Sequence, residues 1–213
     1  MLIHMIIHFI RHGETDFHAG GRYAGQLDIS LNANGLDQSR NLTKWIEGIN
    51  LDLIVSSDLK RAVETATELS GISNRKLKID SRFREIDFGV LSGLSREEIR
   101  LKHPAIYDVF FNFPTQASFP DGESVEAAMD RTLFGLLDLV NDVRLSEILI
   151  VCHATLFRLV LCVLLGLNPD QYRTHFSGLK NASITTIEIP KNLIFKELSE
   201  CANLIRYDEE FIA

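Results

Sequence analysis

Short apolar segments alternate with helical patterns along this chain, and that alternation limits the folds that it can adopt. The apolar segments are rich in Ile, Leu and Val and are short enough to be buried strands. They cover residues 3–10, 51–55, 77–79 and 148–151. Patterns with helical spacing of apolar residues cover 36–46, 58–69, 124–143 and 155–165. This order predicts an α/β three-layer sandwich, with a mainly parallel central sheet and helices on both faces.

Two local signals add detail to this prediction. Residues 184–189 and 193–198 flank a turn at Pro190–Asn192, so we expect these two segments to pair as a hairpin. Ser57 or Asp58 precedes the second helical pattern, and short polar side chains at such positions cap helices. We therefore expect one of these two side chains to cap that helix.

The length and composition are typical of one globular domain. A chain of 213 residues with 46% hydrophobic content can bury a sizeable core. We expect residues 1–213 to form a single domain, with a lid or insert at about 102–121, where the patterns are less regular. The formal net charge of -7, without a block of like charge, argues against a dedicated nucleic-acid binder and against a polybasic membrane-surface protein.

Cysteine usage and the apolar segments favour a cytoplasmic location. The three cysteines are odd in number and widely spaced, and Cys152 and Cys162 lie in apolar runs, so we expect reduced thiols rather than disulfides. The first residues lack the pattern of a signal peptide, and the longest apolar stretch, residues 159–167, is too short to span a bilayer. The C-terminal tail could pack on the domain or on a partner, so the sequence leaves both a monomer and a homodimer as alternatives.

Residues suited to catalysis follow four of the predicted strands. Arg11 and His12 follow the first strand, Arg61 lies one turn into the helix after the second, and His153 follows the strand at 148–151. Glu85 lies beyond the third strand. Because chemistry in such folds gathers at the carboxyl ends of the strands, we expect these five side chains to converge.

This set of side chains suits phosphoryl transfer. Arginines offer planar arrays of donors that neutralise phosphate oxygens and the charge that develops in the transition state. A neutral imidazole can act as a nucleophile, and a carboxyl group can protonate the leaving oxygen and later activate water. The arginines and the second histidine supply positive charge, so the sequence predicts neither a metal nor a cofactor.

Four motifs, in order, resemble the histidine phosphatase superfamily, whose fold is called phosphoglycerate mutase-like. They are FIRHGET, SSDLKRAVETA, EIDFGVLSG and VCHATLFR. The resemblance implies that His12 is the nucleophile that becomes phosphohistidine, and that Glu85 is the proton donor and later the base. It further implies a substrate-binding set for a small phosphorylated metabolite. That set is Arg11, His18, Gly25, Arg61, His153 and Ala154.

The chain departs from the pattern of many relatives at two places. The motif RHGETxxN ends here with His18, which either replaces the contact of the asparagine with phosphate or faces solvent. The glycine pair that usually follows the second histidine is here Ala154–Thr155. A backbone N–H survives both of these changes, so we expect activity to be retained in a pocket of altered shape.

The resemblance is compatible with two activities, a phosphatase and a phosphoglycerate mutase that depends on 2,3-bisphosphoglycerate. Such mutases carry basic residues in the insert, whereas residues 101–122 contain only Lys102 and His103 as basic groups. The segment is instead rich in aromatic residues. Their side chains could form an apolar lid or anchor a surface helix to the core. We favour a phosphatase of small phosphomonoesters.

Two further alternatives can be weighed from the residues alone. His4, His8 and His12 share one face of a strand, but they would spread over roughly 27 Å, too far to hold one metal ion. A non-catalytic module that only binds a phosphorylated ligand is a different class of function. The intact set of catalytic residue types argues against it.

Overall fold

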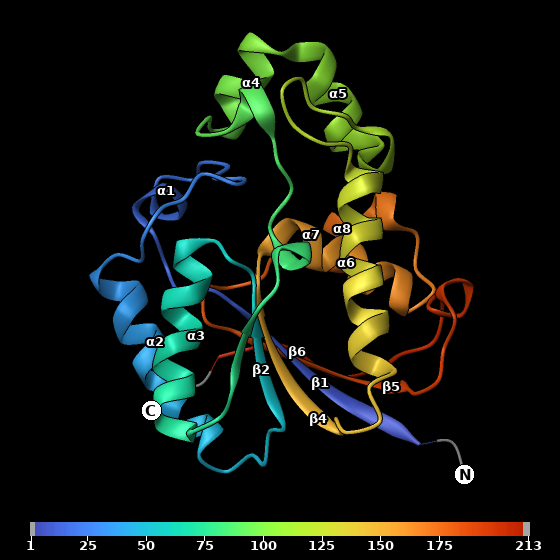
Figure 1. The fold of residues 1–213 in the computed structure, drawn as a ribbon. Helices are drawn as coiled ribbons and strands as arrows, with labels where there is room; N and C mark the ends of the chain where they lie inside the picture. The colour runs from blue at the N-terminus through green and yellow to red at the C-terminus, as the bar shows by residue number, and fades with distance from the viewer. Residues whose placement is uncertain (1–2, 211–213) are drawn as a thin grey trace.

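Six strands form one central sheet in the computed structural model, which describes residues 3–210 (Figure 1). Their order across the sheet is β3-β2-β4-β1-β5-β6. The strands are β1 (His4–Arg11), β2 (Leu53–Ser56), β3 (Leu77–Ile79), β4 (Glu147–Cys152), β5 (Ile184–Pro190) and β6 (Asn203–Glu209). The first four pair in parallel, whereas β5 and β6 are antiparallel to their neighbours. The predicted α/β fold with a mainly parallel sheet is confirmed.

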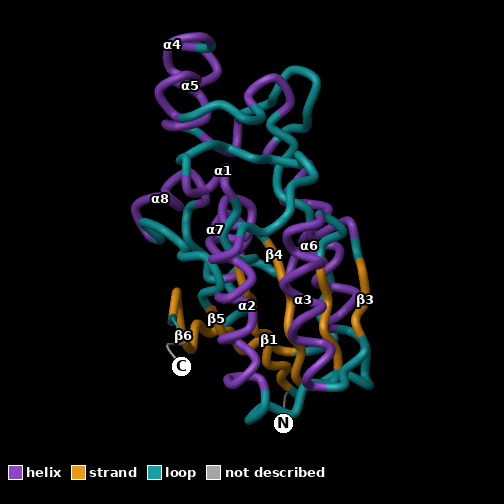
Figure 2. Tube along the Cα trace, turned by 90° about the vertical axis from the view of Figure 1, so that its left-hand side faces the viewer, coloured by secondary structure: helices purple, strands orange, loops and turns teal. Residues whose placement is uncertain are grey.

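Helices cover both faces of the sheet, as the two perpendicular views show (Figures 1 and 2). Helices α2 (Ala33–Ile46) and α3 (Lys60–Ser73) pack on one face, and α6 (Val125–Val140) and α7 (Ala154–Leu164) pack on the other. Strand β1 explains how both faces are filled, because alternate side chains point to opposite sides. Ile7 and Phe9 face α6 and α7, whereas Ile10 faces α2 and α3.

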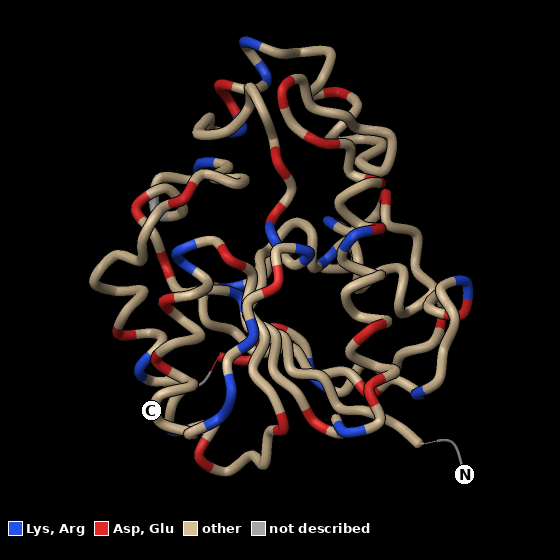
Figure 3. The backbone as a smooth tube through the Cα atoms, viewed as in Figure 1, with Lys and Arg blue, Asp and Glu red and all other residues tan. Residues whose placement is uncertain are grey.

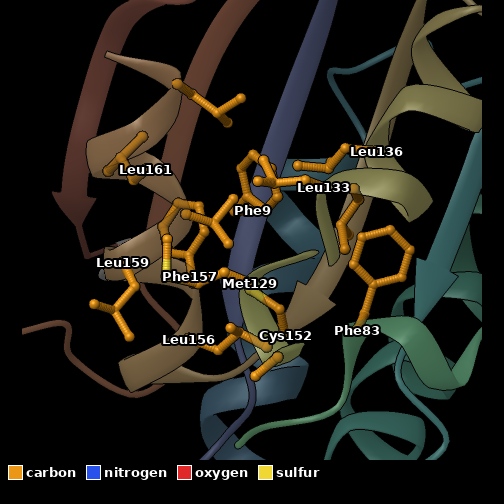
Figure 4. Close-up of a cluster of buried hydrophobic side chains, with 14 of the residues drawn as sticks. Phe9, Phe83, Met129, Leu133, Leu136, Cys152, Leu156, Phe157, Leu159 and Leu161 are labelled. Carbon is orange, nitrogen blue, oxygen red and sulfur yellow. The ribbon is translucent and has the colours of Figure 1, made fainter. Parts of the chain in front are cut away.

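The larger core lies between the sheet and the pair α6–α7 (Figure 4). The ring of Phe9 stacks on that of Phe157, with 4.4 Å between the ring centroids, and thereby fixes α7 against the central strand. Leu133 and Leu136 of α6 are buried beside them. Because both β1 and β4 are covered on both faces, each reads as an almost continuous apolar run.

The predicted cap of α3 is wrong. Helix α3 begins after Leu59, which has no capping side chain, because both candidate polar residues are engaged elsewhere. Asp58 accepts two hydrogen bonds from the guanidinium of Arg84, each 2.6 Å long. The hydroxyl of Ser57 lies 2.7 Å from Nε2 of His153. Tertiary partners thus displaced the local capping role of these two side chains.

The predicted hairpin is also wrong in its second arm. Strand β5 pairs with β6, and residues 195–197 form a short 3-10 helix. Two contacts hold this segment away from the sheet edge. The side chain of Asn141 bonds both backbone polar groups of Leu193, and the ring of Phe195 stacks on Phe134 at 4.3 Å. The backbone N–H and carbonyl of Leu193 are therefore bonded to Asn141, the C-cap of α6, and are not available to a strand partner.

An excursion of the chain rises beyond the carboxyl ends of the strands and contains α4 (Arg96–Lys102) and α5 (Pro104–Asn112) (Figures 1 and 2). Its base is closed by the hydrogen bond from Val90 N–H to the carbonyl of Pro120, 3.0 Å long. The excursion therefore spans residues 90–120 and begins before the predicted insert at 102–121. Movement of this segment as a lid stays a prediction.

The aromatic residues of the excursion include anchors to the core. Phe110 is fully buried and packs against Phe88 and Phe119, with ring centroids 5.6 and 5.3 Å away. Phe113 differs, because 54% of its surface is exposed. The anchoring interpretation therefore applies to Phe110 and Phe119, whereas Phe113 is exposed to solvent.

Residues 3–210 contain no helix that combines the length and the apolar character needed to cross a membrane. The three cysteines are free thiols, of which Cys152 and Cys162 are buried and Cys201 is half-buried. Burial raises the pKa of the Cys152 thiol well above its usual value. This thiol is therefore an apolar core group, although it directly precedes His153.

The anchoring role predicts a difference between two phenylalanines. Phe110→Ala should lower the free energy of unfolding by about 3–5 kcal/mol, because it leaves a cavity among packed rings. Phe113→Ala is the matched control and should change it by about 0.5 kcal/mol or less, because the side chain is exposed. Urea unfolding at pH 7.5 measures both. Equal losses in the two variants would contradict the anchoring role.

Candidate active site

His12 lies at the point where β1 ends, and its imidazole is held in one tautomer. Its Nδ1 lies 2.7 Å from the carbonyl oxygen of Gly13, so Nδ1 carries the proton and donates it to that oxygen. The lone pair is therefore on Nε2, which accepts a hydrogen bond from Nε of Arg61 at 3.1 Å. Only 1% of His12 is exposed.

The surroundings of His12 keep its imidazole neutral. Burial is the largest cause, and the charge of Arg61 adds to it, so the pKa of His12 is well below its usual value. A neutral imidazole with an unprotonated nitrogen is a nucleophile at neutral pH. The site thus presents Nε2 of His12 in its reactive form.

His153 lies beside His12 because β4 lies beside β1. The rings are 5.1 Å apart between centroids, and burial together with the charge of Arg61 lowers the pKa of His153 well below its usual value. Its Nε2 is bonded to the Ser57 hydroxyl at 2.7 Å. Its Nδ1 is buried and has no hydrogen-bond partner within residues 3–210, so this atom is available to a ligand.

Arg11 and Arg61 bring two buried positive charges to the same place. Arg61 donates to the carbonyls of Gly25 and Leu27, and Arg11 donates to that of Leu179. Burial lowers the pKa of each guanidinium to about 10, so both remain charged at neutral pH. Within the described part of the chain, neither forms a salt bridge with a carboxylate, and Nε of Arg11 is buried without a partner. Such a pair of cations is suited to an anionic ligand.

Glu85 is held by backbone N–H groups at the start of α7. Its carboxylate accepts from Thr155 and Leu156, each at 2.9 Å, and from Ile86 at 3.0 Å. Because these donors are backbone groups, the replacement of the usual glycine pair by Ala154–Thr155 leaves them in place. The carboxylate is therefore fixed in direction, and only 6% of Glu85 is exposed.

The loop that carries Glu85 is fixed by an ion pair that sequence reasoning did not find. Arg131 of α6 donates to the carbonyls of Arg82, Arg84 and Glu85, and it binds Glu123 at 2.6 Å. A long side chain inside a helical pattern gives no sequence signal for such a role, because it reads as part of a solvated face. The position of Glu85 thus depends on α6 as well as on α7.

His18 and Gly25 complete the wall near His12. His18 lines the cleft rather than facing solvent, with Nδ1 2.6 Å from the Thr15 hydroxyl and its ring 4.8 Å from that of His12. Burial and the nearby arginines lower its pKa to about 3. Gly25 has a φ of +53°, which disfavours other residues, and its carbonyl accepts from Arg61.

Gly13 permits a close approach of two backbone segments. A Cβ at this position would collide with the backbone of Gly35 in α2. The amide N–H of Gly13 donates to the Thr65 hydroxyl at 3.0 Å. This glycine therefore lets the loop after β1 pack tightly between α2 and α3.

A cleft of about 350 Å³ lies at the carboxyl ends of the strands, and Arg11, Arg61 and Glu85 line it. His12 and His153 are not part of this lining, because each is only 1% exposed. The charged residues of the cleft are Arg11, Arg22, Arg61, Arg96, Arg158 and Glu85, beside His18 and Ala154. Lys and Arg positions and Asp and Glu positions are both spread over the chain, and several Lys and Arg positions lie in the centre of the view (Figure 3). Of these five arginines, the sequence analysis predicted Arg11 and Arg61. Arg158 belongs to the motif VCHATLFR, but it was not predicted because it does not directly follow a strand.

The histidines of β1 do not gather around one point. His8 is buried against α2, with its ring nitrogens 2.9 Å from Thr186 and from Glu147, whereas His4 is exposed. Residues 3–210 contain no group of three or more His, Cys, Asp or Glu side chains placed to hold a metal ion. His8 is thus a bonded core histidine.

Comparisons with known proteins agree with this geometry. The model of the histidine phosphatase superfamily (branch 1) matches residues 7–198. Phosphoserine phosphatase 1 of Hydrogenobacter thermophilus is 32% identical over 190 residues, which cover 88% of this chain and 89% of that protein. A probable phosphoglycerate mutase of Enterobacter sp. is 29% identical over 182 residues, covering 85% and 84%. The mycobacterial glucosyl-3-phosphoglycerate phosphatase superposes with a TM-score of 0.83 at 27% identity, covering 96% of this chain and 99% of that one.

The depressed histidine pKa values predict acid sensitivity. As the pH falls below 6.5 toward 3, the unfolded chain takes up a proton on His18 that the folded chain refuses, so the free energy of unfolding decreases. The slope is at most about 1.4 kcal/mol per pH unit for each fully buried imidazole and less for half-buried His18. His18→Asn should therefore lose less stability between pH 7.5 and 5.5 than the wild type.

Urea unfolding at the two pH values measures this difference. The exposed His4→Asn variant serves as the control and should lose as much stability as the wild type. The same loss of stability in His18→Asn as in the wild type would contradict the lowered pKa of His18 in the folded protein.

Proposed function

The chain belongs to branch 1 of the histidine phosphatase superfamily, and from that premise we propose that it is a metal-independent phosphatase of small phosphomonoesters. In this proposal His12 forms a phosphohistidine intermediate, and Glu85 acts as general acid and then as general base. The observation that carries the proposal is the neutral, buried imidazole whose Nε2 lone pair lies beside two arginines without carboxylate partners in residues 3–210.

The first step transfers the phosphoryl group to the enzyme. Nε2 of His12 attacks phosphorus, a P–N bond forms, and the P–O bond to the alcohol breaks. The protonated carboxyl group of Glu85 gives its proton to the leaving oxygen, so that a neutral alcohol departs. The Nε donor of Arg61 moves from Nε2 to a phosphate oxygen. Arg11 and Nδ1 of His153 bind the remaining oxygens and stabilise their charge.

The second step returns the enzyme to its starting state. A water molecule attacks phosphorus, the P–N bond breaks, and the carboxylate of Glu85 takes one proton from that water. The products are inorganic phosphate and His12 with its lone pair again on Nε2. Glu85 is again protonated, so protons and electron pairs balance over the cycle.

Access of water favours a phosphatase over a mutase. A mutase has to keep water away from phosphohistidine until the phosphoryl group is returned to a second substrate. Arg96 is the only described residue of the excursion that lines the cleft, and none between Leu101 and Gly122 does, so α5 does not cover it. Faster turnover in a mutase assay with 2,3-bisphosphoglycerate than in hydrolysis would reverse this preference.

Replacement of the nucleophile tests the intermediate. His12→Ala should lower the hydrolysis of p-nitrophenyl phosphate by more than about a thousandfold and should abolish acid-labile phosphoryl labelling, because no other side chain replaces Nε2. The folded state of the variant is checked by its melting temperature. Retained activity and labelling would remove the proposal, and tight binding of phosphate esters without hydrolysis by the wild type would favour a non-catalytic module.

Replacement of the acid tests a role that depends on the leaving group. Glu85→Gln should slow the hydrolysis of an alkyl phosphate by about 100- to 10,000-fold, because an alkoxide leaves poorly without a proton. For p-nitrophenyl phosphate, whose leaving group needs little protonation, the first step should persist and the second should stall. Rapid mixing should then show a burst of about one p-nitrophenol per site. Equal losses for both substrates, without a burst, would contradict this role.

A further inference from the structure

The cleft contains more positive charge than one phosphate group requires. Five arginines line it, and Arg11 and Arg61 already account for the contacts beside His12. Arg22 is neutralised, because its guanidinium binds the Glu98 carboxylate at 2.7 Å. Neither Arg96 nor Arg158 forms a salt bridge with a carboxylate of residues 3–210. Arg96 belongs to the excursion, where it donates to the Tyr107 hydroxyl and lies over the ring of Phe111. Arg158 lies in α7, and its charge acts on Arg11 and is available to a ligand.

The guanidinium of Arg158 is held rigidly at the cleft wall. Its Nε donates to the carbonyl of Ala154 and its Nη1 donates to that of Phe176, each at 3.0 Å. The group also lies over the ring of Tyr172, 4.9 Å from the centroid. These contacts leave Nη2 as a further donor, and an arginine fixed in this way loses little conformational entropy when it binds an anion.

Arg158 lies near the phosphate-binding arginines rather than at a remote place. Burial is the main cause of the lowered pKa of Arg11, and the positive charge of Arg158 lowers it further, because the two guanidinium groups repel each other. Both also line the same cleft, together with Ser177 and Leu179 from the segment after α8 (Tyr172–His175). Two uncompensated cations in one wall favour a ligand that carries negative charge at two points.

The cleft offers no anionic partner for a positively charged substrate group. Among the described residues that line it, Glu85 is the only carboxylate, and its oxygens are held by three backbone N–H groups. An ammonium group near Arg158 would therefore meet positive charge without compensation. The electrostatics of the wall distinguish between substrates that differ only in such a group.

We propose that Arg158 binds a second anionic group of the substrate, so that the preferred substrates are phosphomonoesters with a carboxylate or second phosphate and no ammonium group. This inference rests on the proposed phosphatase activity and narrows its substrate class. The first anionic group, the scissile phosphate, lies against His12, Arg11 and Arg61. The second group lies against Nη2 of Arg158 and orients the ester for attack.

Pairs of esters that differ in one charged group test this preference in the wild type. The ratio kcat/KM should be roughly 10- to 100-fold higher for 3-phosphoglycerate than for glycerol 3-phosphate, because a charge-assisted hydrogen bond is gained. Fructose 1,6-bisphosphate should exceed fructose 6-phosphate if a second phosphate is also accepted, and this pair separates the two anions. Phosphoserine should fall below 3-phosphoglycerate. A preference for glycerol 3-phosphate or for phosphoserine would overturn the inference.

Variants then assign the preference to one side chain. Arg158→Gln should lower the 3-phosphoglycerate to glycerol 3-phosphate ratio of kcat/KM to about one, mainly through KM, and Arg158→Lys should restore part of it. Arg100→Gln is the matched control, because Arg100 is exposed and pairs with Glu97 in α4. An unchanged ratio in Arg158→Gln would contradict the assignment.

The outcomes separate this inference from the proposed function. Hydrolysis of p-nitrophenyl phosphate that depends on His12, without any preference between the paired esters, would overturn the second-anion site alone. Absence of hydrolysis with every ester would instead overturn the phosphatase proposal. Because the wild-type comparison needs no variant, a folding defect in Arg158→Gln would leave the inference open to test.

Discussion

The parallel pairing of β1 with β4 is the constraint on which the candidate site depends. Arg11 lies opposite Cys152 in that register, and the N–H of His12 donates to the carbonyl of Cys152 at 3.1 Å. The next residues along the two strands, His12 and His153, are therefore side by side where the sheet ends. A change of register would separate these rings, and the buried apolar faces of both strands oppose such a change.

The site stores positive charge without acidic partners, and the fold makes this tolerable. The guanidinium groups of Arg11, Arg61 and Arg158 donate to backbone carbonyls of loops and of the first turn of α7. Carbonyl dipoles satisfy the donors without neutralising the charge, so the cations remain available to an anion. Burial keeps the imidazole of His12 neutral, and the charges of Arg61 and Arg11 add to this effect, which links the binding of phosphate to the reactivity of the nucleophile.

Much of the architecture was predictable because strands buried on both faces are short apolar runs that few other structures explain. The errors arose where tertiary contacts replaced local signals. Ser57 or Asp58 was expected to cap α3, but Ser57 is bonded to His153 and Asp58 is bonded to Arg84 instead. Residues 193–198 have the composition of a strand, yet Asn141 and Phe134 hold them beside α6.

By itself, the sequence determined the parallel strands, the residues at their exits and the motifs of the superfamily, because these are local patterns, whereas the antiparallel edge strand β6 was not predicted. Only the tertiary structure decided which other side chains support the site. Arg131 and Arg158 lie in helices, where their spacing resembles that of ordinary surface residues. Their roles depend on which carbonyls and carboxylates lie within reach after folding. That information is long-range, since the partners lie in other segments of the chain.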